Sequence, residues 1–299
     1  MHYAKLWCVI LGLAILGGNL KSEETSKMQF SFTIRPDKET VMQGEPCIIL
    51  LTFTNMTSTN ITLEFGFDEV YSLIFSVIDE KGNSVLNHGR IEPILWRGSL
   101  GVKMPIIPPG SSATKKVVLN QWCPILLSKG TYTVVCLFKQ PSSTISATAK
   151  CKLKIVPGDE YKLTKIFDDI ANAIRPDSKY DEIDFSLTML AYSRSPLAVR
   201  SLNKLIFTKG IFPRYTEEPR LTEAIRGLER IGTSAAAQEL VNVVETEKTD
   251  PSFFSVRIRD EAALSLFRLK DMSRDPEIIR LCEKITSSRP RPVERVIRD

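Results

Sequence analysis

Hydrophobic and polar residues alternate along residues 28–156 in short runs with a period of two. Phe30, Phe32 and Ile34 alternate with polar residues, and this spacing puts them on one face of a strand. Turn residues such as Pro108-Pro109-Gly110 separate the runs. Many short strands between turns are typical of an antiparallel β-sandwich. The expected strands are 30–34, 47–53, 61–65, 73–78, 117–119, 131–138 and 151–155.

The pattern becomes helical after Val156-Pro157-Gly158-Asp159. Pro and Gly end the last strand, and Asp159 can cap the helix that follows, in which Leu163 and Phe167 lie at helical spacing. The sequence therefore predicts a β domain over 28–156, a helical domain over 159–287 and a patternless, mobile tail over 288–299. The further expected helices are 181–194, 196–208, 217–231, 234–247, 254–269 and 275–286. Ser195, Thr233 and Asp275 are the expected caps at the second helix of each pair.

The helical domain repeats itself. Leu190, Leu228 and Leu266 follow one another at intervals of 38 residues. A repeat of this length is one pair of helices, which buries its apolar face only by stacking on its neighbours. Stacked helix pairs form binding surfaces more often than catalytic centres, so the repeat predicts a binding or scaffolding protein.

The β domain resembles the immunoglobulin-like sandwiches of secreted bacterial proteins, including the intracellular proteinase inhibitor-like group. The resemblance is carried by Val41-Met42-Gln43-Gly44-Glu45-Pro46 before a strand that ends Thr52-Phe53-Thr54-Asn55, and by Lys129-Gly130-Thr131-Tyr132-Thr133-Val134. It implies a fold, and a fold does not give a function. Proteinase inhibition enters by analogy alone, since no residue matches an inhibitory contact.

The helical domain resembles HEAT-type repeats of the short bacterial variety over about 181–287. The first helix of such a repeat is similar to residues 258–271, and its end is similar to Arg226-Gly227-Leu228-Glu229-Arg230-Ile231-Gly232-Thr233. The first copy has Tyr192-Ser193 where the repeat would have Ile-Gly. We therefore expect the first copy to be irregular.

The N-terminus has the pattern of an export signal. Lys5 precedes an uncharged apolar run, Leu6 to Leu16, and Gly17-Gly18 supplies the small residues of a cleavage site. The run is shorter than the ~20 residues that span a bilayer. We expect residues 1–22 to be a signal, cleaved within 17–22, with an uncleaved anchor as the alternative. The mature protein would then be periplasmic or extracellular, without a membrane span.

Charge is unevenly distributed, although the net charge of the 299 residues is only +5. Residues 23–80 carry 3 Lys/Arg against 10 Asp/Glu, whereas residues 81–156 carry 11 against 1. Either the two halves of the β domain neutralise each other, or the domain presents a basic face to an anionic surface or polymer.

Four of the cysteines after the signal lie in the β domain, at Cys47, Cys123, Cys136 and Cys151. An oxidising compartment would allow disulfides among them. Cys47 and Cys136 fall on the expected inward faces of opposing strands, as in immunoglobulin domains, which makes them one candidate pair. Cys123 or Cys151 as a partner, and no bridge at all, remain alternatives. Cys282 lies on an apolar helical stripe and is expected to be a buried thiol.

Candidate chemistry is sparse. His88 is the single histidine after the signal, so a multi-histidine metal site is excluded, and no nucleophile motif supports a triad built on His88. The chain has no phosphate-binding or dinucleotide-binding glycine motif. Trp96 and Trp122 are either packed residues or a sugar platform. We expect no catalytic residue, cofactor, metal or nucleic-acid partner.

One polar row on the second helix of each pair is the remaining candidate. Equivalent positions in stacked repeats form a continuous stripe, which is either a solvated face or a basic groove for a peptide or an acidic segment of a partner protein. The row consists of Arg200, Lys204, Gln238, Asn242, Arg280 and Lys284.

Together these patterns predict an exported, non-enzymatic scaffolding protein that binds a protein partner through its helical-repeat surface. One alternative is an accessory or inhibitory protein of an extracytoplasmic hydrolase. The other is a carbohydrate or cell-surface adhesin that uses Trp96 or Trp122 of the sandwich.

Overall fold

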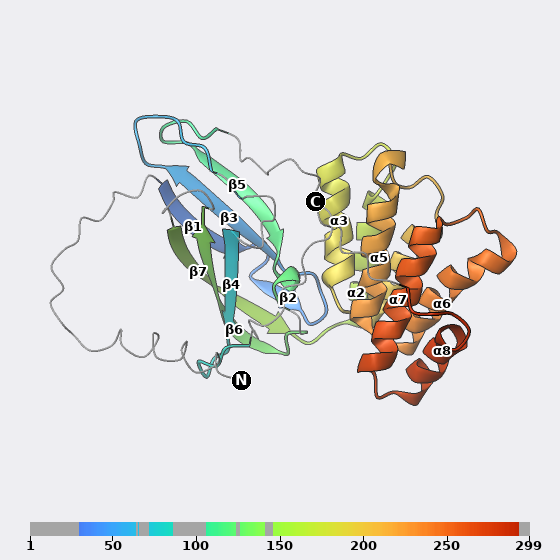
Figure 1. Ribbon diagram of the computed structural model, residues 1–299. Coiled ribbons are helices and arrows are strands. Elements are labelled where there is room, and N and C mark those ends of the chain that lie inside the picture. The colour runs from blue at the N-terminus through green and yellow to red at the C-terminus, as the bar shows by residue number, and fades with distance from the viewer. Residues whose placement is uncertain are drawn as a thin grey trace, which may run out of the picture.

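The computed structural model describes residues 30–63, 65, 72–85, 106–123, 126–140 and 146–292. Strands form its N-terminal half and helices its C-terminal half (Figure 1). The expected signal over 1–22, His88 and Trp96 lie outside the described residues. Within these ranges, no helix is long and apolar enough to cross a bilayer.

The strands form two sheets. The first has three antiparallel strands in the order β1-β3-β5, and the second has four strands in the order β2-β7-β6-β4. In the second sheet β2 pairs parallel with β7, whereas the other neighbours are antiparallel. The strands are β1 (Phe30–Pro36), β2 (Thr40–Met42), β3 (Ile48–Asn55), β4 (Leu73–Ile78), β5 (Ser112–Val118), β6 (Gly130–Lys139) and β7 (Ser146–Val156).

Both sheets contribute to one hydrophobic core. The predicted inward faces are confirmed, because alternate residues of β3 and β6 are buried. Phe53 of β3 and Phe138 of β6 meet edge to face at 5.1 Å between ring centroids, and Phe32 stacks on Phe53 at 4.7 Å. Such aromatic pairs stabilise a core beyond the area they bury.

Four strands differ from the expectation. The strand expected at 151–155 begins earlier, at Ser146. Residues 61–63 and 65 form no strand, and Ile61 makes a single bridge to Ile107. The strand expected at 117–119 begins earlier, at Ser112, and ends at Val118, before a 3₁₀ turn. Strand β2 was not predicted, because three residues are too short to show a period.

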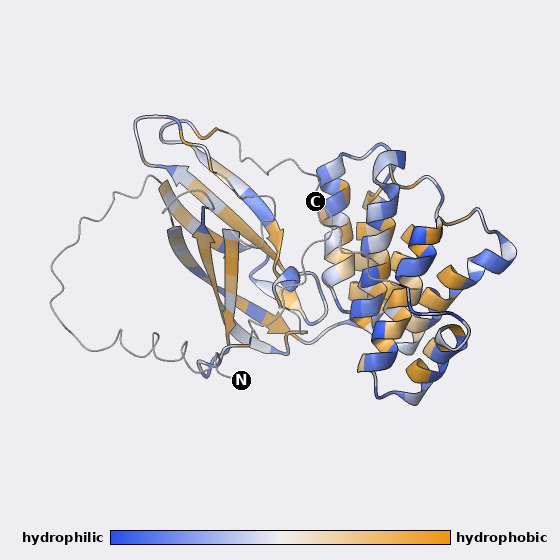
Figure 2. Cartoon of the chain, viewed as in Figure 1, coloured by the Kyte–Doolittle hydropathy of each residue, from blue (hydrophilic) through white to orange (hydrophobic). Residues whose placement is uncertain are grey.

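Seven α-helices follow in residues 160–286 and lie in two layers (Figure 1). Helices α3, α5 and α7 pack side by side in one layer, and α2, α4, α6 and α8 form the other. Their apolar faces meet between the layers (Figure 2). The helices are α2 (Glu160–Ala173), α3 (Tyr180–Tyr192), α4 (Val199–Phe207), α5 (Glu217–Ile231), α6 (Ser234–Thr249), α7 (Val256–Met272) and α8 (Pro276–Thr286).

Most predicted helix caps are confirmed. Asp159 accepts a hydrogen bond from the Lys162 amide at 3.0 Å, and Thr233 and Asp275 cap α6 and α8 in the same way. Ser195 does not cap: its side chain accepts no capping bond, and a 3₁₀ turn over Pro196–Ala198 precedes α4. Helix α4 therefore begins at Val199.

Positions 38 residues apart occupy matching places in the helical half. Leu190, Leu228 and Leu266 are fully buried on α3, α5 and α7. The left-handed residue after α5, Gly232 at φ 65°, is matched by Arg194 after α3, at φ 56°. The first copy therefore departs from the repeat pattern at Arg194, which stands where the second copy has Gly232, and not at the expected Tyr192-Ser193. The first copy keeps the backbone of the second without its glycine.

The two halves touch through β2 and the loop that follows it. Met42 packs against the helical core, and the backbone at Gly44 faces Leu163 of α2 and Ser195. A crevice of about 170 Å³ lies beside this contact, lined by residues of both halves that include Val41, Ile48, Ile166, Ile170 and Met189. The junction therefore contains apolar side chains and some open space.

Part of the predicted tail is held against the helices. Arg289 pairs with Asp260 at 2.8 Å, and Arg291 pairs with Asp271 at 3.0 Å. These contacts attach residues 288–292 to α7. Residues 293–299 lie outside the described ranges.

Candidate functional site

The predicted polar row lies on α4, α6 and α8, which share one layer. Each of these helices buries its apolar stripe toward the other layer, which leaves the row facing away from the core. Five of the six side chains are exposed, and Gln238 is half-buried. The row therefore lies on the surface, but its members have different surroundings.

The two lysines of the row bind the preceding helix of the same layer. Lys204 on α4 donates to Oδ1 of Asn172 on α2 at 2.6 Å, and Lys284 on α8 donates to Glu245 on α6 at 2.8 Å. Hydrogen bonds from Lys284 and then Lys248 hold the pKa of Glu245 below its ordinary value of 4.5. The lysines thus link successive helices of this layer.

The centre of the row consists of two uncharged residues, Gln238 and Asn242, which hydrogen-bond to each other. Gln238 donates to Oδ1 of Asn242 at 2.9 Å, and Asn242 donates to Glu239 at 3.0 Å. All three residues are on α6, one or two turns apart at most. This part of the row has amide groups but no net positive charge.

The two arginines at the ends of the row remain available. Arg200 on α4 and Arg280 on α8 are exposed, and neither takes part in an ion pair with any residue of the described ranges. An exposed guanidinium presents five donors in a planar fork that fits a carboxylate. Arg200 and Arg280 are therefore the row members best placed to meet an acidic partner.

The opposite layer carries a chain of ion pairs that the sequence did not indicate. Arg226 on α5 donates to Glu261 on α7 at 2.8 Å, and Glu229 on α5 accepts from Ser265 and Arg268 on α7 at 2.7 and 2.8 Å. These partners are 35 to 39 residues apart, close to the repeat spacing. That spacing is the one signal in the sequence that could have revealed them.

Two buried arginines near the starts of α5 and α7 bind neighbouring parts of the helical half: Arg220 binds helix α3, and Arg259 binds the loop before α7. Arg220 on α5 is 2% exposed, bonds Asp184 at 2.8 Å and reaches the Tyr180 carbonyl at 3.3 Å. Arg259 on α7 is 5% exposed and donates to the carbonyls of Pro251 and Phe254. Buried charge is tolerated where it is hydrogen-bonded, so both arginines hold the stack together rather than facing a ligand.

The cysteines form no disulfide in the described residues. Cys47 and Cys136, the candidate pair, are both buried thiols, and burial raises the pKa of each well above its ordinary value of 9.0. Cys151 lies on the inward face of β7 and pairs with Val134 of β6, two residues before Cys136. Cys282 is a buried thiol, as expected, and its pKa is raised by burial to about 11.

Trp122 is a packed residue, which confirms the first of its two expected roles and contradicts the second, the sugar platform. It is 4% exposed, its indole N–H donates to the Leu73 carbonyl at 2.8 Å, and its ring lies 4.9 Å from that of Phe75. A sugar platform needs an open ring face. Within the described ranges, no group of three or more His, Cys, Asp or Glu side chains could hold a metal ion.

Comparisons with known proteins assign no family. No protein-family model matches the chain, and no curated protein matches it in sequence. Similar solved structures include a transglutaminase from red sea bream (7% identity, 44% of this chain and 17% of that one, TM-score 0.28). They also include a mutant β-glucosidase from Listeria innocua (9% identity, covering 42% of this chain and 16% of that one, TM-score 0.25). A third is BslA, a bacterial hydrophobin (16% identity, covering 44% of this chain and 97% of that one, TM-score 0.22).

The chain spans less than a fifth of the length of those two enzymes. Each TM-score is too low to carry an argument about fold or activity.

Proposed function

We propose that this chain is an exported, non-enzymatic interaction module, built from an immunoglobulin-like β-sandwich and a HEAT-like stack, that binds a partner protein through the α2-α4-α6-α8 layer. The matching burial of Leu190, Leu228 and Leu266 supports the stacked-repeat interpretation. The single observation that carries the binding surface is the pair of exposed arginines, Arg200 and Arg280, that have no ion-pair partner within the described ranges.

The partner segment that fits this layer is extended and acidic. Its carboxylates would reach Arg200 and Arg280, while amides such as Gln238 and Asn242 bond a peptide backbone between them. Lys204 and Lys284 stay with Asn172 and Glu245, where they add positive potential without being required as direct contacts.

Charge reversal of the two arginines tests the proposal. A partner captured by the wild-type chain from its native envelope fraction would be identified and purified, and its affinity for Arg200→Glu/Arg280→Glu measured. We expect that affinity to fall by at least about tenfold, since close opposite charges across an interface contribute about 1.5 kcal/mol or more. The wild-type interaction should also weaken with salt, because exposed charges are screened beyond about 8 Å at physiological ionic strength.

The matched control is Arg214→Glu/Arg274→Glu. Both residues are exposed arginines between helices, outside the row, and their reversal changes the net charge by the same amount. Loss of affinity in the row variant alone supports the proposal. Equal affinity of wild-type chain and row variant for the purified partner would show that the row is a solvated face.

A further inference from the structure

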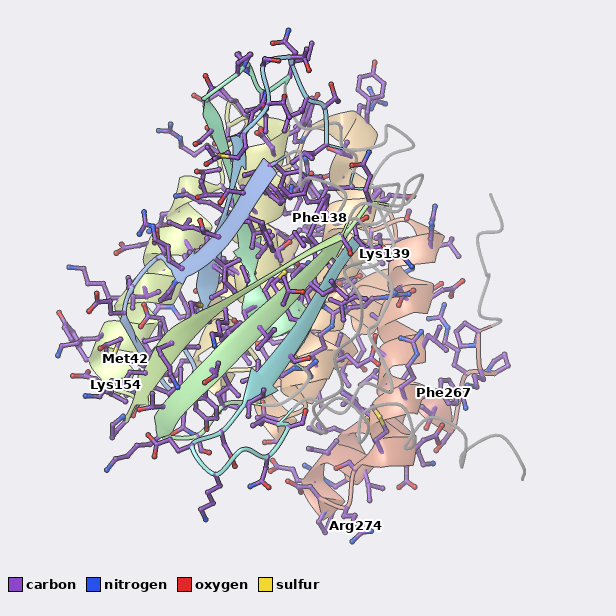
Figure 3. The ribbon with its side chains drawn as sticks, turned by 90° about the vertical axis from the view of Figure 1, so that its left-hand side faces the viewer. Met42, Phe138, Lys139, Lys154, Phe267 and Arg274 are labelled. Carbon is purple, nitrogen blue, oxygen red and sulfur yellow. The ribbon has the colours of Figure 1, made fainter. Side chains whose placement is uncertain are left out.

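The outer face of the four-stranded sheet carries a row of lysines. On β7 the outward positions Lys150, Lys152 and Lys154 are exposed, whereas Leu153 and Ile155 between and beside them are buried. Side chains on one face of a strand repeat about every 7 Å, so these three ammonium groups lie in a line. Lys139, at the end of β6, lies at the far end of the sheet from Lys154 (Figure 3). We call Lys139, Lys150, Lys152 and Lys154 the lysine row.

The lysine row has no acidic counterpart. Within the described ranges none of its members forms an ion pair, and Lys152 donates to the Thr133 hydroxyl at 2.9 Å. Glu39 is the acidic residue beside Lys154, and its backbone carbonyl accepts from the Lys154 amide at 3.2 Å, but its side chain forms no ion pair with the row in the part of the chain that the structure describes. Glu45 binds Lys38 and the Met42 amide, and Asp79 binds Asn83 and Lys81 in its own turn. Among the described residues, therefore, no carboxylate pairs with the lysine row on this face.

Apolar side chains lie directly beside the lysine row. On the same outer face, Leu137 of β6 lies opposite Ile74 of β4, and Val135 of β6 lies opposite Lys150 of β7. Ile74 is 38% exposed, and Leu137 and Val135 are half-buried. We call Ile74, Val135 and Leu137 the apolar strip. The face thus has three lysines along β7, a fourth at the end of β6, and a partly exposed apolar strip on β6 and β4 beside them.

The helical half does not cover this face. Helix α3 contacts β5 of the other sheet and the 3₁₀ turn after it, and the helical half meets the four-stranded sheet at the edge strand β2. The outer face of the four-stranded sheet is turned away from the helices (Figures 1 and 3). The lysine row and the apolar strip are therefore open to a partner from outside the chain.

We propose that this face docks onto an anionic lipid surface. At the boundary between headgroups and acyl chains, lysines meet lipid phosphates and carboxylates while adjacent apolar side chains leave water. Anionic lipids complement the uncompensated charge of the lysine row, and the interface takes in the apolar strip at the same time. An anionic polymer would neutralise the lysines but leave the apolar strip in water, so the combination favours a lipid surface.

Vesicle binding by the full chain tests this inference. Phosphatidylcholine vesicles with and without phosphatidylserine would be sedimented with the wild-type chain and with Lys139→Gln/Lys150→Gln/Lys152→Gln/Lys154→Gln. Each lysine near an anionic surface strengthens binding about fivefold, so loss of all four should weaken binding to anionic vesicles by on the order of several hundredfold. Binding through the apolar residues 6–16 would appear equally with neutral vesicles and with the variant.

Two further variants separate the competing explanations. The control Lys165→Gln/Lys179→Gln/Lys209→Gln/Lys248→Gln removes the same charge from exposed positions of the helical half and should bind as the wild type does. Ile74→Thr/Leu137→Thr should weaken binding to vesicles but not to dextran sulfate, a soluble polyanion.

The proposal is overturned if the lysine-row variant sediments with anionic vesicles as the wild type does, or if the wild-type chain binds no anionic vesicles. Binding to dextran sulfate without binding to vesicles would also overturn it, and would assign the face to an anionic polymer. Melting curves of all variants check that the sheet is intact.

Discussion

Two residues in left-handed conformation end successive helices of the same layer. Gly232 follows α5 at φ 65°, and Arg194 follows α3 at φ 56°. Glycine adopts this conformation without a steric penalty, whereas a residue with a Cβ is strained by roughly 1–2 kcal/mol. The second copy has the residue that the backbone requires, and the first copy bears the strain.

Gly232→Ala should therefore destabilise the protein by about 1 kcal/mol. Added atoms are not the cause, because a Cβ at this position would meet its nearest neighbour, the Glu229 carbonyl oxygen, at an ordinary 3.6 Å. Chemical denaturation measures the free energy of unfolding. Gly232→Asn is the control, since asparagine tolerates the left-handed region and should cost less. An alanine variant as stable as the wild type would contradict the backbone explanation.

The buried thiols should react slowly in the native protein. At pH 8 a thiol of pKa about 11, such as Cys282, is ionised in only about one molecule in a thousand, and the thiolate is the reactive form. Alkylation followed by mass spectrometry should label Cys151 first, because it is half-buried while Cys47, Cys136 and Cys282 are buried. Rapid native labelling of Cys136 would contradict its placement in the core. All of these cysteines should react once the chain is unfolded without reductant, because they are free thiols and not disulfides.

At the scale of elements, periodicity predicted most of the structure. Strand β4 and helix α5 have the predicted limits, because each is a continuous periodic run between clear turns. Strand β2 and the early part of β5 were missed, since a short strand and a polar edge strand carry no alternating pattern. Ser195 makes no capping bond, and the chain enters α4 through the 3₁₀ turn Pro196–Ala198.

The candidate row was predicted as a surface feature, but its partners were not. The sequence places Lys204 and Lys284 on one face of their helices. Whether their ammonium groups reach Asn172 and Glu245 depends on how closely neighbouring helices pack. A helical period fixes direction around one helix axis and says nothing of the distance between axes.

Leu240→Ala should loosen the helical stack. Leu240 on α6 is fully buried, and large-to-small changes in a core cost about 2–5 kcal/mol. The matched variant Asn242→Ala, an exposed position on the same helix, should change the free energy of unfolding by about 0.5 kcal/mol or less. Thermal unfolding followed by far-ultraviolet circular dichroism compares the two. Equal effects would contradict the assignment of α6 to the core.

Lys284→Met should raise the pKa of Glu245 toward 4.5, because Lys284 makes the largest contribution to lowering it. Since that pKa is lower in the fold, the contact stabilises the protein above pH 4.5 and loses this effect as the pH falls through the folded value. The pair is partly exposed, so the variant should lose at most about 1 kcal/mol at neutral pH. Carboxyl titration by NMR checks the shift. An unchanged pKa would show that Lys284 does not bind Glu245 in solution.

At the scale of the whole molecule, the junction joins a strand half and a helical half through limited contact. Cleavage near Pro157 should give two soluble pieces, since each half has its own hydrophobic core. Circular dichroism should show the first piece to be mainly β and the second mainly α. The helical piece should melt at a lower temperature than in the full chain, because Leu163 loses its contact with the strand half at Gly44. A first piece that is helical, or a second that is unfolded, would contradict two independent cores.

The parallel pairing of β2 with β7 has a consequence for biosynthesis. Thr40 and Val41 can pair with Lys154 and Ile155 only after about 110 further residues have been made, which takes on the order of ten seconds at the rate of translation. During that time β2 has no partner strand, and once β6 has been made its edge stays unpaired until β7 follows. A nascent chain that stalls before residue 156 is therefore the form most exposed to aggregation. A chaperone would have to shield the strand half until the first helix begins to emerge.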